Sequence, residues 1–455
     1  MDQQTTKRSS FTGKIGFVLA AAGSAVGLGN IWRFPYLAAK YGGGIFLLVY
    51  VALAVTFGFV LMMAEISIGR KTGKSAIGAF AALDKRFTFV GWLTALVPSI
   101  ILPYYSVIGG WVMKYIFGFV TGDGANMATD TYFSEYIGTV GEPILWFGIF
   151  ILITAIVVFF GVEKGIEKVS KVMMPVLIAF ILFIVIYTLC TLDGALDGVL
   201  YYITPDFSKF SVMTVVAALG QLFYSMSLAM GIMITFGSYM KKDISIERSI
   251  HQIEIFDTGI AFLSGLMIVP AVFAFSGGNE DALGKGPSLM FVTLPKIFET
   301  MPGGDIIGAL FFIMVFFAAI TSSISLMETI VSIVMDKAGL SRRISCIIVF
   351  AGVILIGLPS TLGYSIWSEV KILGFQFLDF FDFISNSIIM PIIAFITCLF
   401  VGYFIKPKTI IEEAQLEKKP FTAKLFTVMI RYIAPICIIA ILVSSILDAL
   451  GILKI

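Results

Sequence analysis

Eleven long apolar runs, separated by charged or glycine- and proline-containing connections, dominate this 455-residue sequence. At about 20 residues each, such runs can cross the hydrocarbon core of a bilayer as helices. Their approximate limits are 14–37, 43–69, 89–119, 143–161, 166–190, 212–240, 248–276, 306–335, 345–364, 375–405 and 425–449. The pattern predicts an all-α polytopic membrane protein, with residues 1–455 forming a single transmembrane domain in the lipid bilayer.

The composition supports this assignment and limits the partners. Hydrophobic residues make up 58% of the chain and charged residues only 13%, whereas soluble domains have near half and about a quarter. A net charge of +2 with one histidine gives no basic surface, so no nucleic-acid partner is expected. The four cysteines lie in or beside apolar runs without metal-ligand spacing, and we interpret them as small buried hydrophobic residues.

Lysine and arginine are concentrated in alternate connections between the runs. They gather around residues 7–14, 70–86, 164–171, 241–248, 337–343 and 406–424. Under the positive-inside rule, this asymmetry predicts a multi-pass protein of the cell (inner) membrane with a cytoplasmic N-terminus and a C-terminus outside. The polar N-terminal segment has no small-residue cleavage site before the first run, so we expect the first span to be retained.

Two of the predicted spans carry unusual interruptions. The first run contains closely spaced glycines followed by polar side chains at membrane depth: Gly23, Gly27, Gly29, Asn30 and Arg33. The sixth has a weaker set at the matching depth: Gln221, Ser225, Ser227, Ala229 and Gly231. Glycines alone would be explained by close helix packing, but packing does not require polar residues that are costly to bury. The first and sixth helices are therefore predicted to be broken.

Breaks at corresponding positions predict two inverted five-helix repeats with a site at the membrane midplane. The repeats would be helices 1–5 (about 14–190) and helices 6–10 (about 212–405), followed by helix 11 (about 425–449). Unwound backbone is tolerated in a membrane only where it lines a cavity. Its free carbonyls suit a cation, and N–H groups at half-helix ends suit a carboxylate. Sodium and a zwitterion together fit both.

Residues 22–35, AGSAVGLGNIWRFP, resemble the first-helix signature of the neurotransmitter:sodium symporters. Further resemblance lies in residues 104–105, 221–227, 318–323 and 377–382, so nearly the whole chain is covered. The chain is most similar to bacterial amino-acid transporters related to the bacterial leucine transporter, in an eleven-helix form. The resemblance implies sodium-coupled symport of a free amino acid by alternating access, two sodium sites, no organic cofactor and no enzyme activity. It leaves the oligomeric state open.

Two sodium sites are implied by matching the family motifs residue by residue. The first would use the Ala25 carbonyl, Asn30, Ser225 and Asp257, together with the substrate carboxylate. The second would use the carbonyls of Gly23, Val26 and Ala318 and the hydroxyls of Thr321 and Ser322. An alternative for these hydroxyls is that each bonds back to a carbonyl one turn earlier, as isolated Ser and Thr commonly do in membrane helices.

The same matching implies the substrate pocket. Its residues would be Ala25, Leu28, Gly29, Ile101, Tyr105, Tyr224, Ser225, Ser227, Met230, Ser322 and Leu326. The Leu28 and Gly29 amides and the Tyr105 hydroxyl would meet the carboxylate. The remaining surface is mostly apolar with a few hydroxyls, which favours a hydrophobic or aromatic amino acid, although Met230 alone could be ordinary core filling.

Gates are also implied by the resemblance. On the outer side Arg33 would pair with Asp382, directly or through water, with Gln221 nearby and Tyr224 as an aromatic lid. On the inner side Arg8 would pair with Asp336, with Tyr239 in the same network. The alternative for the inner pair is ordinary surface charge of little energetic value. Glu65 resembles the family acid that supports the unwound part of helix 6.

One departure from the family pattern bears on ion dependence. Asp257 stands where the family usually has asparagine, and a fixed carboxylate could supply the charge for which some relatives need chloride. We therefore expect chloride-independent transport. Two other functions are weighed: an ion channel, and an amino-acid-sensing membrane receptor on the same fold. An enzyme is disfavoured, because no zincin motif, complete dinucleotide fingerprint or Walker A loop is present.

Overall fold

The computed structural model describes residues 10–277, 286–450 and 452. Within these ranges the chain forms helices and connections, with no β-strand. In the first half, the α-helices are α1 Lys14–Ala25, α2 Phe34–Lys40, α3 Gly44–Leu53, α4 Phe59–Thr72, α5 Ala76–Leu83, α6 Thr88–Val120, α7 Gly124–Met127, α8 Tyr132–Gly138, α9 Gly141–Phe159, α10 Lys168–Thr191 and α11 Ala195–Ile203. In the second half they are α12 Val212–Ser225, α13 Ile232–Ser238, α14 Ile246–Phe275, α15 Leu294–Thr300, α16 Gly304–Ala338, α17 Arg342–Leu362, α18 Phe377–Asp382, α19 Met390–Leu399, α20 Pro407–Glu413, α21 Pro420–Val428 and α22 Ala434–Ala449.

Several of these helices are joined end to end by short π-helical segments. The segments are η1 Gly29–Arg33, η2 Ala54–Gly58, η4 Val162–Glu167, η7 Leu289–Thr293, η8 Phe383–Ile389, η9 Phe400–Phe404 and η10 Met429–Ile433. In the described part of the chain, nine of the resulting helices are long and apolar enough to cross a membrane, and a bent pair brings the number to ten. Each corresponds to one of the predicted runs. The prediction of an all-helical polytopic membrane protein is confirmed.

The bent pair is the predicted first span. Its two parts, Lys14–Ala25 and Gly29–Lys40, meet at an angle of 57°. The backbone at Val26 is extended (φ −74°, ψ 101°), so the helix stops there. Between the two parts, the amides of Gly27 and Leu28 leave the helical ladder and donate instead to side chains, Asn30 Oδ1 at 3.2 Å and Tyr105 Oη at 3.4 Å.

The predicted sixth run, 212–240, forms two short helices, α12 and α13, with an irregular segment between them. Three residues of that segment have left-handed backbone: Ser227 (φ 53°), Ala229 (φ 61°) and Gly231 (φ 74°). For a residue with a Cβ this conformation costs about 1–2 kcal/mol, so surrounding contacts must hold it. The sequence prediction of a second broken helix agrees with the structure.

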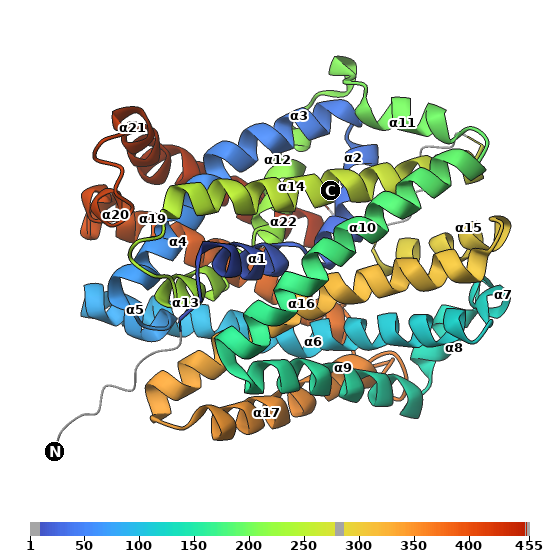
Figure 1. The fold of residues 1–455 in the computed structure, drawn as a ribbon, viewed down its shortest axis with the longest axis horizontal. Helices are drawn as coiled ribbons and strands as arrows, with labels where there is room; N and C mark the ends of the chain where they lie inside the picture. The colour runs from blue at the N-terminus through green and yellow to red at the C-terminus, as the bar shows by residue number, and fades with distance from the viewer. Residues whose placement is uncertain (1–9, 278–285, 451, 453–455) are drawn as a thin grey trace.

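Two groups of helices pack against each other around these breaks (Figure 1). In one group the long helices α6 and α16 pack together and against α9 and α17. In the other, α4 packs against α13 and α14, and α1 packs against α14. α1 and α10 also contact α16, which joins the groups.

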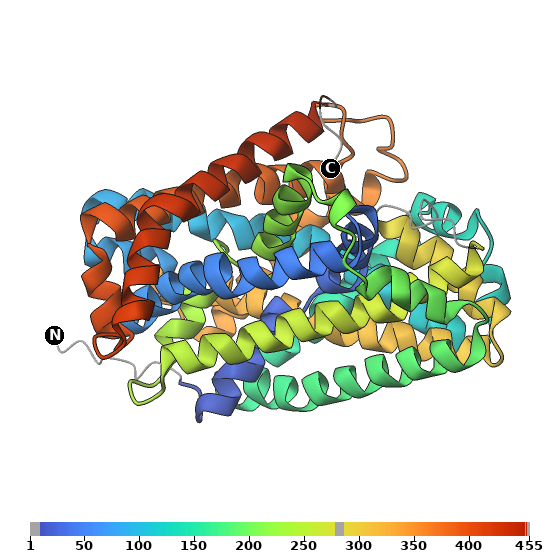
Figure 2. The same cartoon turned by 90° about the horizontal axis from the view of Figure 1, so that it is seen from above.

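The C-terminal helices α19 to α22 lie along one side of the molecule (red in Figure 2). α19 packs against α6 and α22, and α20 packs against α4. We call the end of the molecule that carries α5, α13 and α20 the N-terminal end (Figure 1), because Phe11, before α1, donates its amide to the Tyr239 carbonyl just after α13.

Candidate ion and substrate site

A cavity lies where the two broken helices face α6 and α16. It is lined by Ser24, Ala25, Gly27, Leu28, Gly29, Asn30, Ile101, Tyr105, Tyr224, Ser225, Ser227, Met230, Ile232, Ser322 and Leu326. Every residue expected in the substrate pocket is in this set. The sequence analysis did not assign Ser24 or Ile232 to the site. Both lie next to a break, Ser24 at the end of α1 and Ile232 at the start of α13, so they line the cavity together with the predicted residues.

The residues proposed for the first sodium site surround Asp257, which is fully buried on α14. The Asn30 amide Nδ2 donates to Asp257 Oδ1 at 2.7 Å. Ser225 Oγ lies 3.3 Å from Asp257 Oδ2, and Tyr50 Oη donates to the same oxygen at 3.1 Å. The structure therefore brings Asn30, Ser225 and Asp257 together beside the break of the first span, close to Ala25.

Tyr50 is a member of this cluster that the sequence analysis missed. It is fully buried on α3, and its hydroxyl also lies 2.9 Å from Ser225 Oγ. The available signal was weak, since one tyrosine in an apolar run is typical of a buried core residue. Its hydroxyl supplies the buried carboxylate with a hydrogen bond that an isolated buried charge requires.

The second proposed sodium site lies between α1 and α16. Ser322 Oγ is within hydrogen-bonding distance of three carbonyl oxygens of the first span: Gly23 at 3.4 Å, Ser24 at 3.1 Å and Val26 at 3.2 Å. Thr321 Oγ1 instead bonds back to the carbonyls of Phe317 and Ala318 in its own helix, at 2.9 and 3.2 Å. The alternative weighed from the sequence thus describes Thr321, whereas Ser322 reaches across to the unwound backbone.

The end of the cavity proposed for a carboxylate is formed by backbone and Tyr105. The Leu28 amide donates to Tyr105 Oη at 3.4 Å. Gly27 has no side chain there, and a Cβ added to it would lie 2.9 Å from Ser322 Oγ and 3.2 Å from Tyr105 Oη. Ser227 Oγ donates to the Ser24 carbonyl at 3.0 Å, which links the two broken helices.

Glu65 supports the irregular segment of the sixth span. It is buried on α4, and its Oε1 accepts a hydrogen bond from the Ala229 amide at 2.7 Å. Ala229 is one of the residues with left-handed backbone. The carboxylate thus satisfies an amide that has no helical partner, which is the arrangement that the resemblance implied.

The proposed outer gate residues lie near the cavity, on its side away from the N-terminal end of the molecule. Arg33 Cζ is 5.7 Å from the centre of the Tyr224 ring, and Gln221 Nε2 donates to the Gly29 carbonyl at 3.0 Å. Asp382 Oδ1 accepts from Tyr104 Oη at 3.0 Å and from Asn386 Nδ2 at 2.6 Å. Among the contacts described for these two side chains, none is a direct Arg33–Asp382 ion pair.

The proposed inner gate lies only partly within the described residues. Arg8 is outside them. Asp336 Oδ2 accepts a hydrogen bond from the Ser75 amide at 2.8 Å. Tyr239 Oη donates to Glu328 Oε1 at 2.7 Å. This bond joins the residue after α13 to α16, and the predicted network of Tyr239 with Arg8 and Asp336 stays a prediction.

Glu328 and Arg342 extend the inner network, and the sequence analysis did not find either. Arg342 Nη1 and Nη2 bind the two oxygens of the fully buried Glu328 carboxylate at 2.6 and 2.8 Å. A third hydrogen bond joins Arg342 Nη1 to the Val158 carbonyl at 3.1 Å. The available signal was a carboxylate within the apolar run 306–335, because a buried charge in a membrane helix requires a partner.

Two broken membrane helices around a cavity lined by convergent oxygens are typical of secondary transporters. The chain matches the profile of the "Sodium:neurotransmitter symporter family" over residues 8–133 and 127–452. The chain belongs to this family. It is a sodium-dependent symporter of the membrane and not an enzyme, and the resemblance drawn from residues 22–35 is confirmed.

Individual relatives agree with this assignment. The chain is 34% identical over 451 residues to the "Uncharacterized sodium-dependent transporter YhdH" of Bacillus subtilis, covering 97% of this chain and 98% of the relative. It is 31% identical over 464 residues to an "Uncharacterized sodium-dependent transporter" of Haemophilus influenzae, covering 98% and 100%. The crystal structure of MhsT in complex with L-phenylalanine matches with a TM-score of 0.87 and 36% identity, covering 96% of this chain and 100% of MhsT.

Proposed function

We propose that this protein imports a hydrophobic or aromatic amino acid together with sodium across the cell (inner) membrane by alternating access. The observation that carries the proposal is the cavity between the broken helices. Its side-chain surface is largely apolar, from Ile101, Met230, Ile232 and Leu326, and backbone groups of the first span and several hydroxyls form the rest of the lining. A free amino acid has the same division between an apolar side chain and a charged head. MhsT, which has a similar fold, was solved with L-phenylalanine.

Two sodium ions per cycle are part of this proposal. The cluster of Asn30, Ser225 and Asp257 would hold one ion with the Ala25 carbonyl and the substrate carboxylate. The carbonyls of Gly23, Val26 and Ala318 with the Thr321 and Ser322 hydroxyls would hold the other. Oxygen ligands alone suit a hard monovalent cation, and the contacts of Ser322 with the Gly23 and Val26 carbonyls support the second site.

Orientation follows from the distribution of basic residues. The connections at the N-terminal end of the molecule hold most of the lysines and arginines, which supports a cytoplasmic N-terminus and a C-terminus outside. The N-terminal end of the molecule is therefore cytoplasmic in this proposal, and the Arg33–Asp382 region faces outward.

Uptake by purified protein in proteoliposomes tests the proposal. An inward sodium gradient should drive accumulation of a labelled amino acid, and replacing external sodium with potassium should abolish it. A panel of the twenty amino acids should show competition by hydrophobic and aromatic members, but not by their decarboxylated amines. Conductance without saturable uptake would indicate a channel, and sodium-dependent binding without accumulation would indicate a receptor. Equal inhibition by tyrosine and tyramine would contradict the proposed substrate class.

Replacing Arg33 with alanine is expected to slow transport about tenfold or more while sodium-dependent binding changes little. The reason is that an arginine within an apolar membrane helix is costly to bury and is therefore expected to have a function. Here that function would be to pair with Asp382 when the outer side closes. Uptake and equilibrium binding should be measured on the same preparation. Exposed Arg86, paired with Asp84 at the molecular surface, offers a control substitution that should leave both values near wild type. Normal uptake by Arg33→Ala would contradict the gating role.

A further inference from the structure

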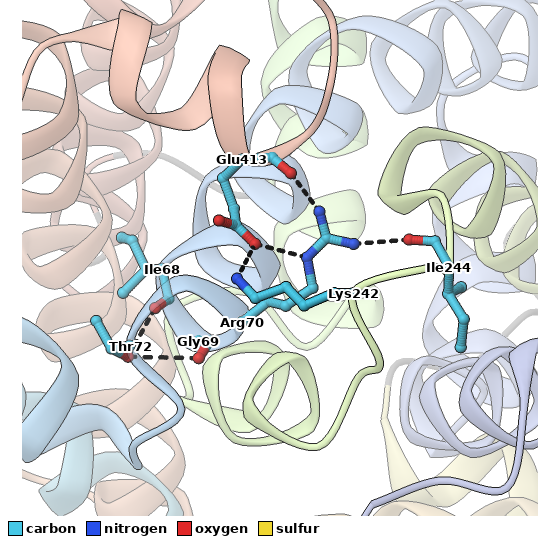
Figure 3. Close-up of polar contacts among 7 residues, drawn as sticks. All are labelled: Ile68, Gly69, Arg70, Thr72, Lys242, Ile244 and Glu413. Carbon is cyan, nitrogen blue, oxygen red and sulfur yellow. Dashed lines mark hydrogen bonds and ion pairs between the residues drawn. The ribbon is translucent and has the colours of Figure 1, made fainter.

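Arg70, at the end of α4, binds two other segments at the N-terminal end of the molecule (Figure 3). It lies in the last turn of α4 with only 5% of its surface exposed. Its Nε donates to Glu413 Oε1 at 2.8 Å, and its Nη1 donates to the Ile244 carbonyl at 2.6 Å. The remaining arm, Nη2, donates to the Glu413 carbonyl. One guanidinium therefore joins α4 to the α13–α14 connection and to the end of α20.

Glu413 accepts hydrogen bonds from both basic side chains of this cluster. Lys242, from the α13–α14 connection, also donates to Glu413 Oε1, at 2.7 Å. Burial alone would raise the pKa of the Glu413 carboxyl, but the hydrogen bonds from Lys242 and Arg70 outweigh burial and lower its pKa below the ordinary value. The carboxylate is therefore ionised at neutral pH. A third ion pair, between Lys419 and Glu247, joins the same C-terminal region to the first turn of α14.

Glu413 is held in place by the backbone of α20. The residue before this helix, Lys406, and the residue two positions after it, Gln415, both have left-handed backbone, with φ of 66° and 58°. Buried Ile410 and Leu416 dock the segment against the protein. Non-glycine residues adopt this conformation only where other contacts define it, so α20 has little freedom to follow a moving partner.

Arg70, by contrast, belongs to a rigid unit of α4 and α13. A Cβ on Gly69 would lie 1.9 Å from the Ile234 carbonyl oxygen, and a Cβ on Gly237 would lie 2.4 Å from the Ile66 carbonyl oxygen. The two helices thus touch along their backbones and must move together. In alternating access, one group of helices rocks against the other. α20 packs against α4 and is also joined through η9 and α19 to α6 of the other group, so the Arg70–Glu413 pair lies where the α4–α13 unit meets a segment tied to that group.

We propose that Arg70 is a positioning residue that latches α4 and the α13–α14 connection to Glu413, and thereby stabilises the state closed at the N-terminal end. For this end to open, either the α4–α13 unit must separate from α20, or α20 must move with it and lose the packing of Ile410 and Leu416. Either change exposes a buried ion pair or breaks it. The latch therefore adds to the free-energy difference between the closed and open states, whichever amino acid is carried.

The test is a reporter cysteine at Thr235, a fully buried residue of α13. The four native cysteines are first replaced, and Thr235→Cys is added. A membrane-impermeant thiol reagent is applied in sodium-free buffer to the side on which the N-terminus lies. Glu413→Gln, which keeps the shape but removes the charge, should raise the modification rate about tenfold, as expected when a charge-assisted bond becomes neutral. The exchanged pair Arg70→Glu with Glu413→Arg should modify more slowly than Arg70→Glu alone.

The control is the neighbouring residue Glu412, whose contact with Lys408 is longer (3.6 Å) and exposed to solvent. Glu412→Gln should leave the modification rate unchanged. If Glu413→Gln does not fold, exposed Lys242→Gln serves instead and should raise the rate in the same direction by a smaller factor. An unchanged rate in a folded Glu413→Gln protein, or an equal increase in Glu412→Gln, would overturn the proposal. Because the readout needs no amino acid, it is separate from the test of substrate class.

Discussion

The Asp257→Asn protein is expected to need at least tenfold more sodium for half-maximal uptake in chloride-free medium, and chloride should partly restore its sodium affinity. Asp257 is fully buried and lies beside Asn30 and Ser225. At about 4 Å and an effective dielectric constant of about 20, a carboxylate attracts a sodium ion by roughly 4 kcal/mol before desolvation is subtracted. Part of that attraction is lost when the carboxylate becomes an amide.

The same substitution separates charge from shape. An asparagine at position 257 can still accept a hydrogen bond from Asn30, so the packing of α14 against the first span should be preserved. Uptake should be measured against sodium concentration in gluconate and in chloride, for wild type and variant. The wild type should transport equally in both media.

Glu254 provides a matched control on the same helix. It is buried one turn from Asp257, and its Oε2 lies 3.0 Å from His251 Nδ1, away from Asn30. Glu254→Gln also removes a buried carboxylate, but it should shift the sodium requirement much less than Asp257→Asn. A wild type that requires chloride would contradict the view that Asp257 replaces the anion. If both variants raised the sodium requirement equally, the cause would be the loss of any buried carboxylate on α14 rather than a specific role of Asp257.

The sequence was sufficient for the fold because membrane spans are defined by length and hydrophobicity, and broken spans by glycines with polar neighbours. The bend within residues 14–40 and the gap between α12 and α13 occur where those signals lie. The grouping of the pocket residues also followed, although only through the family motifs. Spacing alone could not place residues of α6, α12 and α16 around one cavity, because helix packing is decided by contacts far apart in the chain.

The contacts that the sequence analysis missed share a physical cause. Tyr50, Glu328 and Arg70 each act through a partner more than 10 residues away, and no local pattern specifies such a partner. Arg70 lies where the positive-inside rule already explains a basic residue, so its burial gave no separate signal. The sequence therefore identified residue types that need a partner, but it could not identify which residue the partner would be.

Replacing Gly27 with aspartate is expected to reduce amino-acid uptake at least a hundredfold. Gly27 lies where the substrate carboxylate is proposed to sit, between the first sodium position and the Tyr105 hydroxyl. An added Cβ would be 2.9 Å from Ser322 Oγ and 3.2 Å from Tyr105 Oη. The aspartate carboxylate would extend beyond this Cβ into the space of the substrate. Two carboxylates in one desolvated site repel by several kcal/mol, more than the hundredfold loss requires.

Gly27→Ala separates the steric part of this effect from the charge. The alanine methyl group meets the ends of the Ser322 and Tyr105 side chains rather than backbone, so a small shift should accommodate it, with a loss of about threefold to tenfold. Uptake of the best substrate from the competition panel, and its inhibition by the matching decarboxylated amine, should be measured for wild type, Gly27→Ala and Gly27→Asp. The amine lacks the repelled carboxylate, so its inhibition relative to the amino acid should increase in Gly27→Asp. If alanine were as damaging as aspartate, space rather than charge would limit this position, and the proposed carboxylate location would be wrong.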